Sequence, residues 1–191
     1  MSRNVLVTGR PGSGKTTLVL GVVERLAADG FKAGGFVTEE IREGASRAGF
    51  RVRDLAGDAA VLAHVGYRGV PRVGKYGVDT EAFERIALKA LCFAGGERDF
   101  LVIDEIGKME LLSGSFRDLL PALLDSPTPL LATVHRSGDA FTRSLLDRGE
   151  VWVYELSVSG RDALREVVYG RMRGILSEVI ETAKPEGGTE P

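Results

Sequence analysis

Short runs of apolar residues alternate along the chain with segments whose apolar residues recur at helical spacing. Residues 5–7 and 100–103 form continuous apolar runs, which are typical of parallel strands covered on both faces. Segments 17–26 and 80–94 instead place their apolar side chains on one face of a helix. Further strands are predicted at 31–38, 129–134 and 151–156, and further helices at 115–124, 139–147 and 161–183.

This alternation of strands and helices predicts an α/β fold, in which a mostly parallel, Rossmann-like sheet is flanked by helices. Right-handed crossovers would bring the carboxyl ends of the strands to one edge of the sheet. One part of the pattern departs from simple alternation. Residues 39–42 and 48–54 read as two arms of an inserted antiparallel β-hairpin, and 59–65 as a further strand. The loop 66–77 is glycine-rich but carries two tyrosines, so it could flank a nucleotide.

Composition narrows the class of protein. The chain has 191 residues, of which 43% are hydrophobic, and a net charge of −2. We expect one domain at 1–183 and a flexible tail at 184–191. Without an overall basic charge, nucleic acid binding is not expected, and no apolar stretch is long enough to predict a membrane span. The single cysteine, Cys92, excludes an internal disulfide, and its place in an apolar helix predicts a buried side chain. A cytoplasmic location follows as an expectation, and no protein partner is predicted.

A glycine-rich segment joins the first predicted strand to the first predicted helix and matches the phosphate-binding pattern G-x-x-x-x-G-K-[ST]. Backbone N–H groups of such a loop, together with the positive end of the helix, surround one concavity that binds phosphate oxygens. We expect Lys15 to reach the β- and γ-phosphates and the hydroxyl of Thr16 to bind Mg²⁺. The predicted nucleotide-binding residues here are Gly9, Arg10, Pro11, Gly12, Ser13, Gly14, Lys15, Thr16 and Thr17.

The apolar strand at 100–103 leads into two acidic residues, Asp104 and Glu105, which is the Walker B arrangement. We expect Asp104 to hold Mg²⁺ through water and Glu105 to polarise the water that attacks the γ-phosphate. Successive side chains of a strand point in opposite directions, so the two carboxylates need not have the same role.

Two cations, Lys108 and Arg136, are candidates for stabilising the charge that develops on the transferred phosphoryl group. A single arginine is also commonly a solvated surface group, so both interpretations of Arg136 stay open. His64 and His135 are too few and too far apart in sequence to predict a metal cluster, and we interpret both as packing or hydrogen-bonding residues.

Five segments occur in order along the chain: TGRPGSGKTTL (8–18), GFVTEEIREGASRAGF (35–50), VGKYGVDTEAFE (73–84), DEIGKMEL (104–111) and TVHR (133–136). Together they resemble the THEP-type P-loop nucleoside-triphosphatases, a family that includes the vertebrate cancer-related nucleoside-triphosphatase. The similarity extends from residue 5 to about residue 168. The single motifs are common to P-loop proteins, whereas the hairpin segment combined with DEIGKME is specific. One departure is Gly160, which precedes Arg161 where the family commonly has Asn.

The resemblance implies a Mg²⁺-dependent hydrolase that cleaves the γ-phosphate of ATP, GTP, CTP and UTP with little base selectivity. It also implies a P-loop NTPase fold with an added hairpin. Carried over by motif, the second part of the nucleotide site would comprise Leu101, Val102, Ile103, Asp104, Glu105, Ile106, Gly107 and Lys108.

Three other functions share the same phosphate chemistry. A switch GTPase is disfavoured because the sequence has no N-K-x-D guanine-recognition motif. A small-molecule kinase is a stronger alternative, since Arg136, Arg143 and Arg148 could cluster near a phosphate acceptor, although they also suit a solvated face. A nucleotide-gated binding or signalling protein would hydrolyse nucleotide only incidentally.

Overall fold

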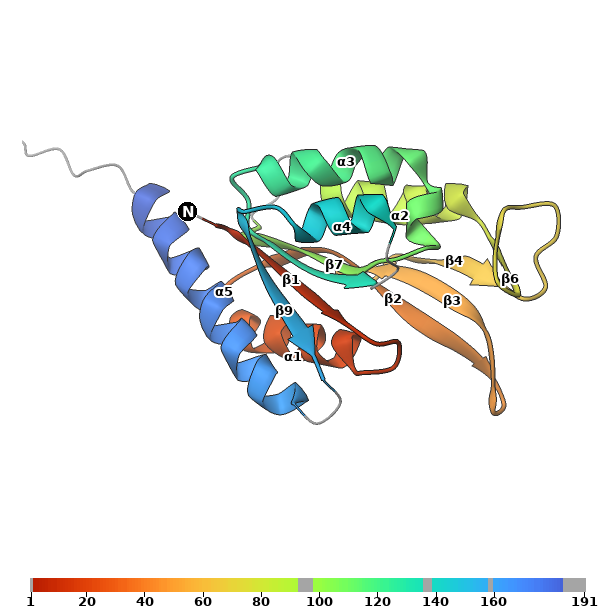
Figure 1. Ribbon diagram of the computed structural model, residues 1–191, viewed down its shortest axis with the longest axis horizontal. Coiled ribbons are helices and arrows are strands. Elements are labelled where there is room, and N and C mark those ends of the chain that lie inside the picture. Colours follow the sequence, from red (N-terminus) through yellow and green to blue (C-terminus); the bar gives the residue numbers. More distant parts are fainter. Residues whose placement is uncertain (1, 93–97, 136–138, 158–159, 184–191) are drawn as a thin grey trace, which may run out of the picture.

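The computed structural model describes residues 2–92, 98–135, 139–157 and 160–183 (Figure 1). Its strands are β1 (Asn4–Gly9), β2 (Ala33–Glu43), β3 (Ser46–Asp54), β4 (Ala59–His64), β5 (Arg72–Val73), β6 (Tyr76–Val78), β7 (Phe100–Ile106), β8 (Leu130–His135) and β9 (Val151–Leu156). Its helices are α1 (Lys15–Ala28), α2 (Thr80–Cys92), α3 (Gly114–Asp125), α4 (Ala140–Leu146) and α5 (Arg161–Ala183), with a 3-10 turn, η1, at Glu110–Leu112.

Within the described residues the strands form one nine-stranded sheet in the order β5-β6-β4-β3-β2-β7-β8-β1-β9. The block from β2 to β9 is parallel, whereas β3, β4, β5 and β6 extend it in antiparallel fashion. The parallel block places the carboxyl ends of β1, β7 and β8 at the same edge. The sheet is therefore the predicted one, mostly parallel at its centre with an antiparallel extension.

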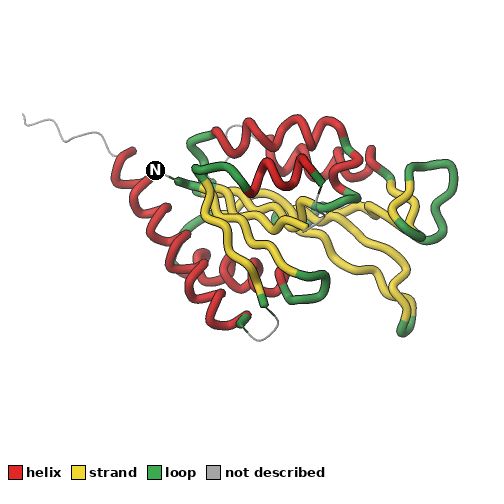
Figure 2. Tube along the Cα trace, viewed as in Figure 1, coloured by secondary structure: helices red, strands yellow, loops and turns green. Residues whose placement is uncertain are grey.

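Helices cover both faces of the sheet, with α2, α3 and α4 on one face and α1 and α5 on the other (Figures 1 and 2). The alternation of side chains along β1 supplies both layers: Leu6 packs with the first group of helices, and Val5 and Val7 pack with the second. All six residues of β1 are buried. A central strand that is buried on both faces explains why its sequence reads as a continuous apolar run.

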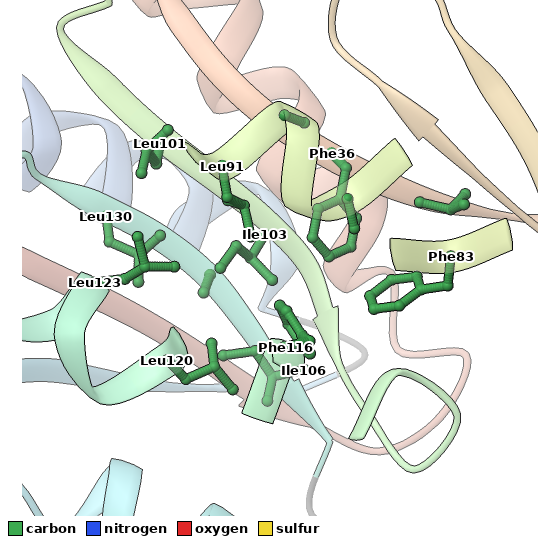
Figure 3. Packing of buried hydrophobic residues seen from close by; sticks show 14 of the residues in the cluster. Phe36, Phe83, Leu91, Leu101, Ile103, Ile106, Phe116, Leu120, Leu123 and Leu130 are labelled. Carbon is green, nitrogen blue, oxygen red and sulfur yellow. The ribbon is translucent and has the colours of Figure 1, made fainter. Parts of the chain in front are cut away.

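Three phenylalanines anchor the larger core (Figure 3). Phe36 of β2, Phe83 of α2 and Phe116 of α3 contact one another edge to face, with ring centroids 5.2 to 5.8 Å apart. Such pairs contribute about 0.5–1.5 kcal/mol each beyond the burial of their area. They fix α2 and α3 against the strand whose far end forms one wall of the site.

The sequence pattern differs from the structure in three places. The strand predicted at 31–38 and the first hairpin arm are one continuous strand, β2, because the chain needs no break to pass from the parallel to the antiparallel pairing. The loop 66–77 contains the short hairpin of β5 and β6. The prediction for Cys92 was wrong: it is exposed, because the buried face of α2 ends at Leu91. No helix among the described residues is long and apolar enough to cross a membrane.

Candidate active site

The glycine-rich loop lies between the end of β1 and the start of α1, as the sequence predicts. Gly12 and Gly14 have φ angles of 75° and 93°, in the left-handed region where a side chain would be strained. Gly14 also caps the amino end of α1, so the first free N–H groups of the helix lie directly beside the loop. Backbone conformation and helix direction together make this loop a suitable binding site for an anion.

Lys15 begins α1, and only 7% of its surface is exposed. Its ammonium donates to the carbonyl oxygen of Gly9 at 3.4 Å and lies 3.4 Å from Oε1 of Glu105. The contact with Glu105 is at ion-pair distance but lacks hydrogen-bond geometry, since Oε1 has no hydrogen-bond partner within the described part of the chain. The two sequence motifs thus meet through a pair of opposite charges.

Asp104 is almost completely buried, with 1% of its surface exposed. The hydroxyl of Thr133, on the neighbouring strand β8, donates to its Oδ1. Burial raises the pKa of Asp104 to about 6, whereas the hydroxyls of Thr133 and Thr16 and the charge of Lys15 lower it. The other oxygen, Oδ2, has no hydrogen-bond partner among the described residues. A bound cation would be a suitable partner for this buried oxygen.

The donor set around Asp104 suits a hard cation. The hydroxyl of Thr16 and the carboxylate of Asp104 are both oxygen ligands, which Mg²⁺ prefers, and Mg²⁺ takes most of its remaining ligands from water and phosphate. Among the described residues no group of three or more His, Cys, Asp or Glu side chains could hold a metal ion. Within that part of the chain no cage is made by protein side chains alone, whereas a site shared with a nucleotide fits the residues present.

Asp104 and Glu105 line the same cavity, although adjacent residues of a regular strand would point in opposite directions. The pairing of β7 with β8 loses its register between Ile103 and Ile106, so the strand is irregular at this point. The expectation of opposite directions was wrong for this reason. Both carboxylates consequently face the loop that carries Lys15.

A third acidic residue, Glu110 of η1, lines the cavity as well. Its side chain is buried, and its Oε1 accepts a hydrogen bond from the hydroxyl of Thr38 at 3.4 Å. Burial, aided by the nearby charges of Glu105 and Asp104, raises the pKa of Glu110 to about 8. At neutral pH this carboxyl group is mostly protonated, so it can donate a hydrogen bond. Glu110 belongs to the DEIGKMEL segment of the family resemblance, although it is not among the predicted site residues.

One cavity of about 460 Å³ joins these groups. It brings together the predicted site residues Pro11, Gly12, Gly14, Lys15, Thr16, Asp104, Glu105, Gly107 and Lys108. It also contains residues that were not predicted as site residues: Thr38, Glu40, Arg47, Phe50, Val73, Gly74, Tyr76, Met109, Glu110 and His135. All ten lie within the segments that carry the family resemblance, but those segments do not specify which of their side chains face a ligand.

Other predicted site residues lie elsewhere. The side chains of Leu101, Val102, Ile103 and Ile106 are buried in the two core clusters and do not line the cavity, so they position β7. Gly9, Arg10, Ser13 and Thr17 are not among the residues lining the cavity, and the side chain of Ser13 is itself buried. Lys108 lines the cavity and is exposed. Arg136 lies outside the described residues.

Gly160 lies directly before α5, and its carbonyl oxygen accepts from the N–H of Leu164 at 2.9 Å. It thus holds the position at which an Asn side chain would cap the helix, but glycine offers no such side chain. The next residue, Arg161, packs against the phosphate-binding loop: a Cβ atom built on Gly14 would lie 3.0 Å from its Cδ.

Comparison with known proteins places this geometry in a family. A family model described as NTPase matches residues 4–169. Nucleoside-triphosphatase THEP1 of Thermofilum pendens is 48% identical over 166 residues, which cover 85% of this chain and 91% of the relative. The protein of the same name from Thermotoga maritima is 41% identical over 160 residues, which cover 84% and 90%. The chain belongs to the THEP1 family of nucleoside-triphosphatases. It is accordingly an enzyme of the hydrolase class, and the resemblance inferred from its motifs is confirmed.

Solved structures agree with this membership. The crystal structure of THEP1 from Aquifex aeolicus superposes with a TM-score of 0.79 at 35% identity, covering 88% of this chain and 98% of that one. The solution structure of a human cancer-related nucleoside triphosphatase gives a TM-score of 0.78 at 36% identity, covering 91% and 98%. The predicted P-loop NTPase fold, with its mostly parallel sheet and antiparallel strands, is confirmed by these matches.

Proposed function

We propose that this THEP1-family protein is a Mg²⁺-dependent nucleoside-triphosphatase that converts ATP, GTP, CTP and UTP to the diphosphate and phosphate. The observation that carries the proposal is the convergence of Lys15, Asp104 and Glu105 in one cavity beside the glycine-rich loop. Cation, metal-binding carboxylate and base are the three parts that phosphoryl transfer to water requires.

In the proposed mechanism the loop N–H groups hold the phosphate chain, and Lys15 contacts the β- and γ-phosphates. Thr16 and Asp104 are the residues that would hold Mg²⁺, which when bound would supply positive charge against the phosphates. Binding of phosphate gives the ammonium of Lys15 new anionic partners, so that Glu105 becomes free to accept a hydrogen bond from the attacking water. We assign to Lys108, which lines the cavity, the role of stabilising charge on the transferred group. We retain Arg136 as a candidate for the same role.

We propose broad base tolerance because the residues to which we assign a role all act on the phosphates, and none of them on the base. The sequence contains no N-K-x-D motif, and it has a single asparagine, Asn4, whose side chain donates to the backbone of Leu124 in the core. Selection of guanine by that motif is therefore excluded. We further propose that residues 1–183 act as one domain, and that the protein is cytoplasmic, since its single cysteine leaves no internal disulfide to favour an oxidising compartment.

The deciding experiment is phosphate release by the purified protein with Mg²⁺ and each of the four nucleoside triphosphates in turn, with no acceptor added. Release from all four, lost when the metal is chelated, is the expected result. Release from GTP alone would contradict the broad specificity, and binding without release from any of them would contradict the hydrolase. Lys89→Ala, at an exposed ion pair with Asp58, provides a control variant remote from the cavity.

A further inference from the structure

The cavity has a second half that phosphate chemistry does not use. Beyond Glu105 its wall is formed by Phe50 of β3, Tyr76 of β6, Val73 and Met109. The rings of Phe50 and Tyr76 meet edge to face at 5.2 Å. These four residues, which we call the aromatic wall, are only half-buried, so part of each side chain is available to a ligand. An apolar wall of this kind suits a planar ring rather than phosphate.

The order of strands separates the aromatic wall from the place where the nucleoside of the substrate would lie. In the sheet, β8, β7 and β2 lie between β1 and β3, so Glu105 at the end of β7 is situated between the phosphate-binding loop and Phe50. The start of α5 approaches the loop on the opposite side of β1, where Arg161 packs against Gly14. A triphosphate that extends its nucleoside from Lys15 toward the start of α5 would leave the aromatic wall to a second ligand. Figure 1 shows the β2–β3 hairpin and β6 projecting past the carboxyl end of β1.

Polar groups divide the two halves of the cavity. The hydroxyl of Thr38 and the buried carboxyl of Glu110 lie between the phosphate-binding residues and the aromatic wall, and Glu40 and Arg47 form an ion pair among the lining residues of the β2–β3 hairpin. A ligand with a ring and several hydrogen-bonding substituents would match these groups. The cavity volume of about 460 Å³ lies in the range of small-molecule sites, about 300–1,000 Å³.

We propose that the aromatic wall binds a second substrate, a heteroaromatic alcohol of nucleoside size, whose hydroxyl takes the place of the attacking water. This inference rests on the proposed function, since it uses the same γ-phosphate position. The acceptor oxygen forms a bond to the γ-phosphorus as the bond from that phosphorus to the β–γ bridging oxygen breaks. The acceptor proton passes to Glu105 and the nucleoside diphosphate leaves. The products are a phosphate monoester and a diphosphate, and no oxidant or reductant is needed.

The test uses the full chain with Mg²⁺, ATP labelled at the γ-phosphate and millimolar adenosine, guanosine, cytidine, uridine or thymidine. Labelled nucleoside monophosphate is separated from labelled free phosphate, which gives the ratio of transfer to hydrolysis in each sample. We expect at least one nucleoside to become labelled. Val73→Trp, which fills the space before the aromatic wall, should lower that ratio about tenfold. Tyr76→Ala, which removes part of the wall, should lower it as well.

Trp152→Ala is the matched control, because Trp152 is exposed on β9 at the other end of the sheet. Its ratio should equal that of the unmodified protein. Hydrolysis in the same samples reports whether each variant is folded. The proposal is overturned if no nucleoside is labelled while hydrolysis proceeds, or if nucleosides only compete with ATP. Labelling without hydrolysis would uphold the second substrate and contradict the hydrolase, so the two proposals fail separately.

Discussion

The ammonium of Lys15 lies 3.4 Å from Oε1 of Glu105, so the cation of the phosphate-binding loop and the second carboxylate of β7 form one charged pair. Lys15 is buried, and Glu105 is only partly exposed. A buried charge needs a partner of opposite charge, and each of these two residues supplies one to the other. Two candidate catalytic residues are thus in contact with each other. A bound phosphate would have to compete with Glu105 for the ammonium of Lys15.

Replacing Lys15 with alanine should abolish turnover and weaken nucleotide binding. The change removes the charge that faces the β- and γ-phosphates, and it leaves the negative charge of Glu105 beside them without its partner. Titration with a fluorescent nucleotide and measurement of phosphate release provide the two readouts, with Lys89→Ala as the control. Activity at the level of the unmodified protein would remove the glycine-rich loop from the mechanism.

Glu105→Gln should retain Mg-nucleotide binding and lower turnover by roughly 100-fold or more, the scale of a lost general base. Glutamine keeps the size of the side chain but cannot accept a proton from water. Single-turnover phosphate release separates this effect from any change in affinity. Glu24→Gln, at an exposed position of α1, is the control. Normal hydrolysis by Glu105→Gln would mean that the substrate itself positions the water.

Sequence reasoning located most of the fold because the apolar pattern and the packing agree. Val5, Leu6 and Val7 are all apolar, which predicts a strand that is buried on both faces. In the structure Val5 and Val7 lie in the core on one side of the sheet, and Leu6 lies in the core on the other. Cys92 shows the limit of that reasoning. It is the last residue of α2, and whether such a residue is buried depends on where the buried face of the helix ends. Pattern alone does not fix that point.

The site was only half predictable for a different reason. Local motifs identify Lys15 and Asp104 because each sits at a fixed place relative to a strand and a helix. Phe50, Tyr76 and Glu110 reach the cavity through tertiary packing of a hairpin, a short β-ribbon and a 3-10 turn, none of which has a spacing rule. The burial that raises the pKa of Glu110 exists only once η1 is folded against β2 and β7.

Mg²⁺ activation should weaken in acid because the metal and a proton compete for Asp104. With a pKa of about 6, its carboxyl is mostly ionised at pH 7 and mostly protonated at pH 5, so the half-saturating Mg²⁺ concentration should rise about tenfold between pH 7 and pH 5. Thr133→Val removes the donor that lowers this pKa, so its rise should begin at higher pH.

The ratio of the two proteins' half-saturating Mg²⁺ concentrations, measured by phosphate release at each pH, isolates Asp104. Protonation of the nucleotide affects both proteins equally and cancels in that ratio. Identical pH profiles for Thr133→Val and the unmodified protein would show that Asp104 does not control metal binding.

Glu110 should make the protein less stable as the pH rises. Its pKa is about 8 in the folded protein and 4.5 without perturbation, so between these values the folded state holds a proton that the unfolded state releases. Stability contributed by this group is complete below pH 4.5 and is lost as the pH rises to about 8, by up to about 1.4 kcal/mol per pH unit.

Glu110→Gln carries no such proton and should lose that slope. Urea unfolding at pH 5, 6.5 and 8 measures it, with Glu24→Gln as the control. The two carboxyl-to-amide variants should differ most at pH 8, where Glu110→Gln is the more stable; parallel pH dependences would show that Glu110 is ionised in the folded protein.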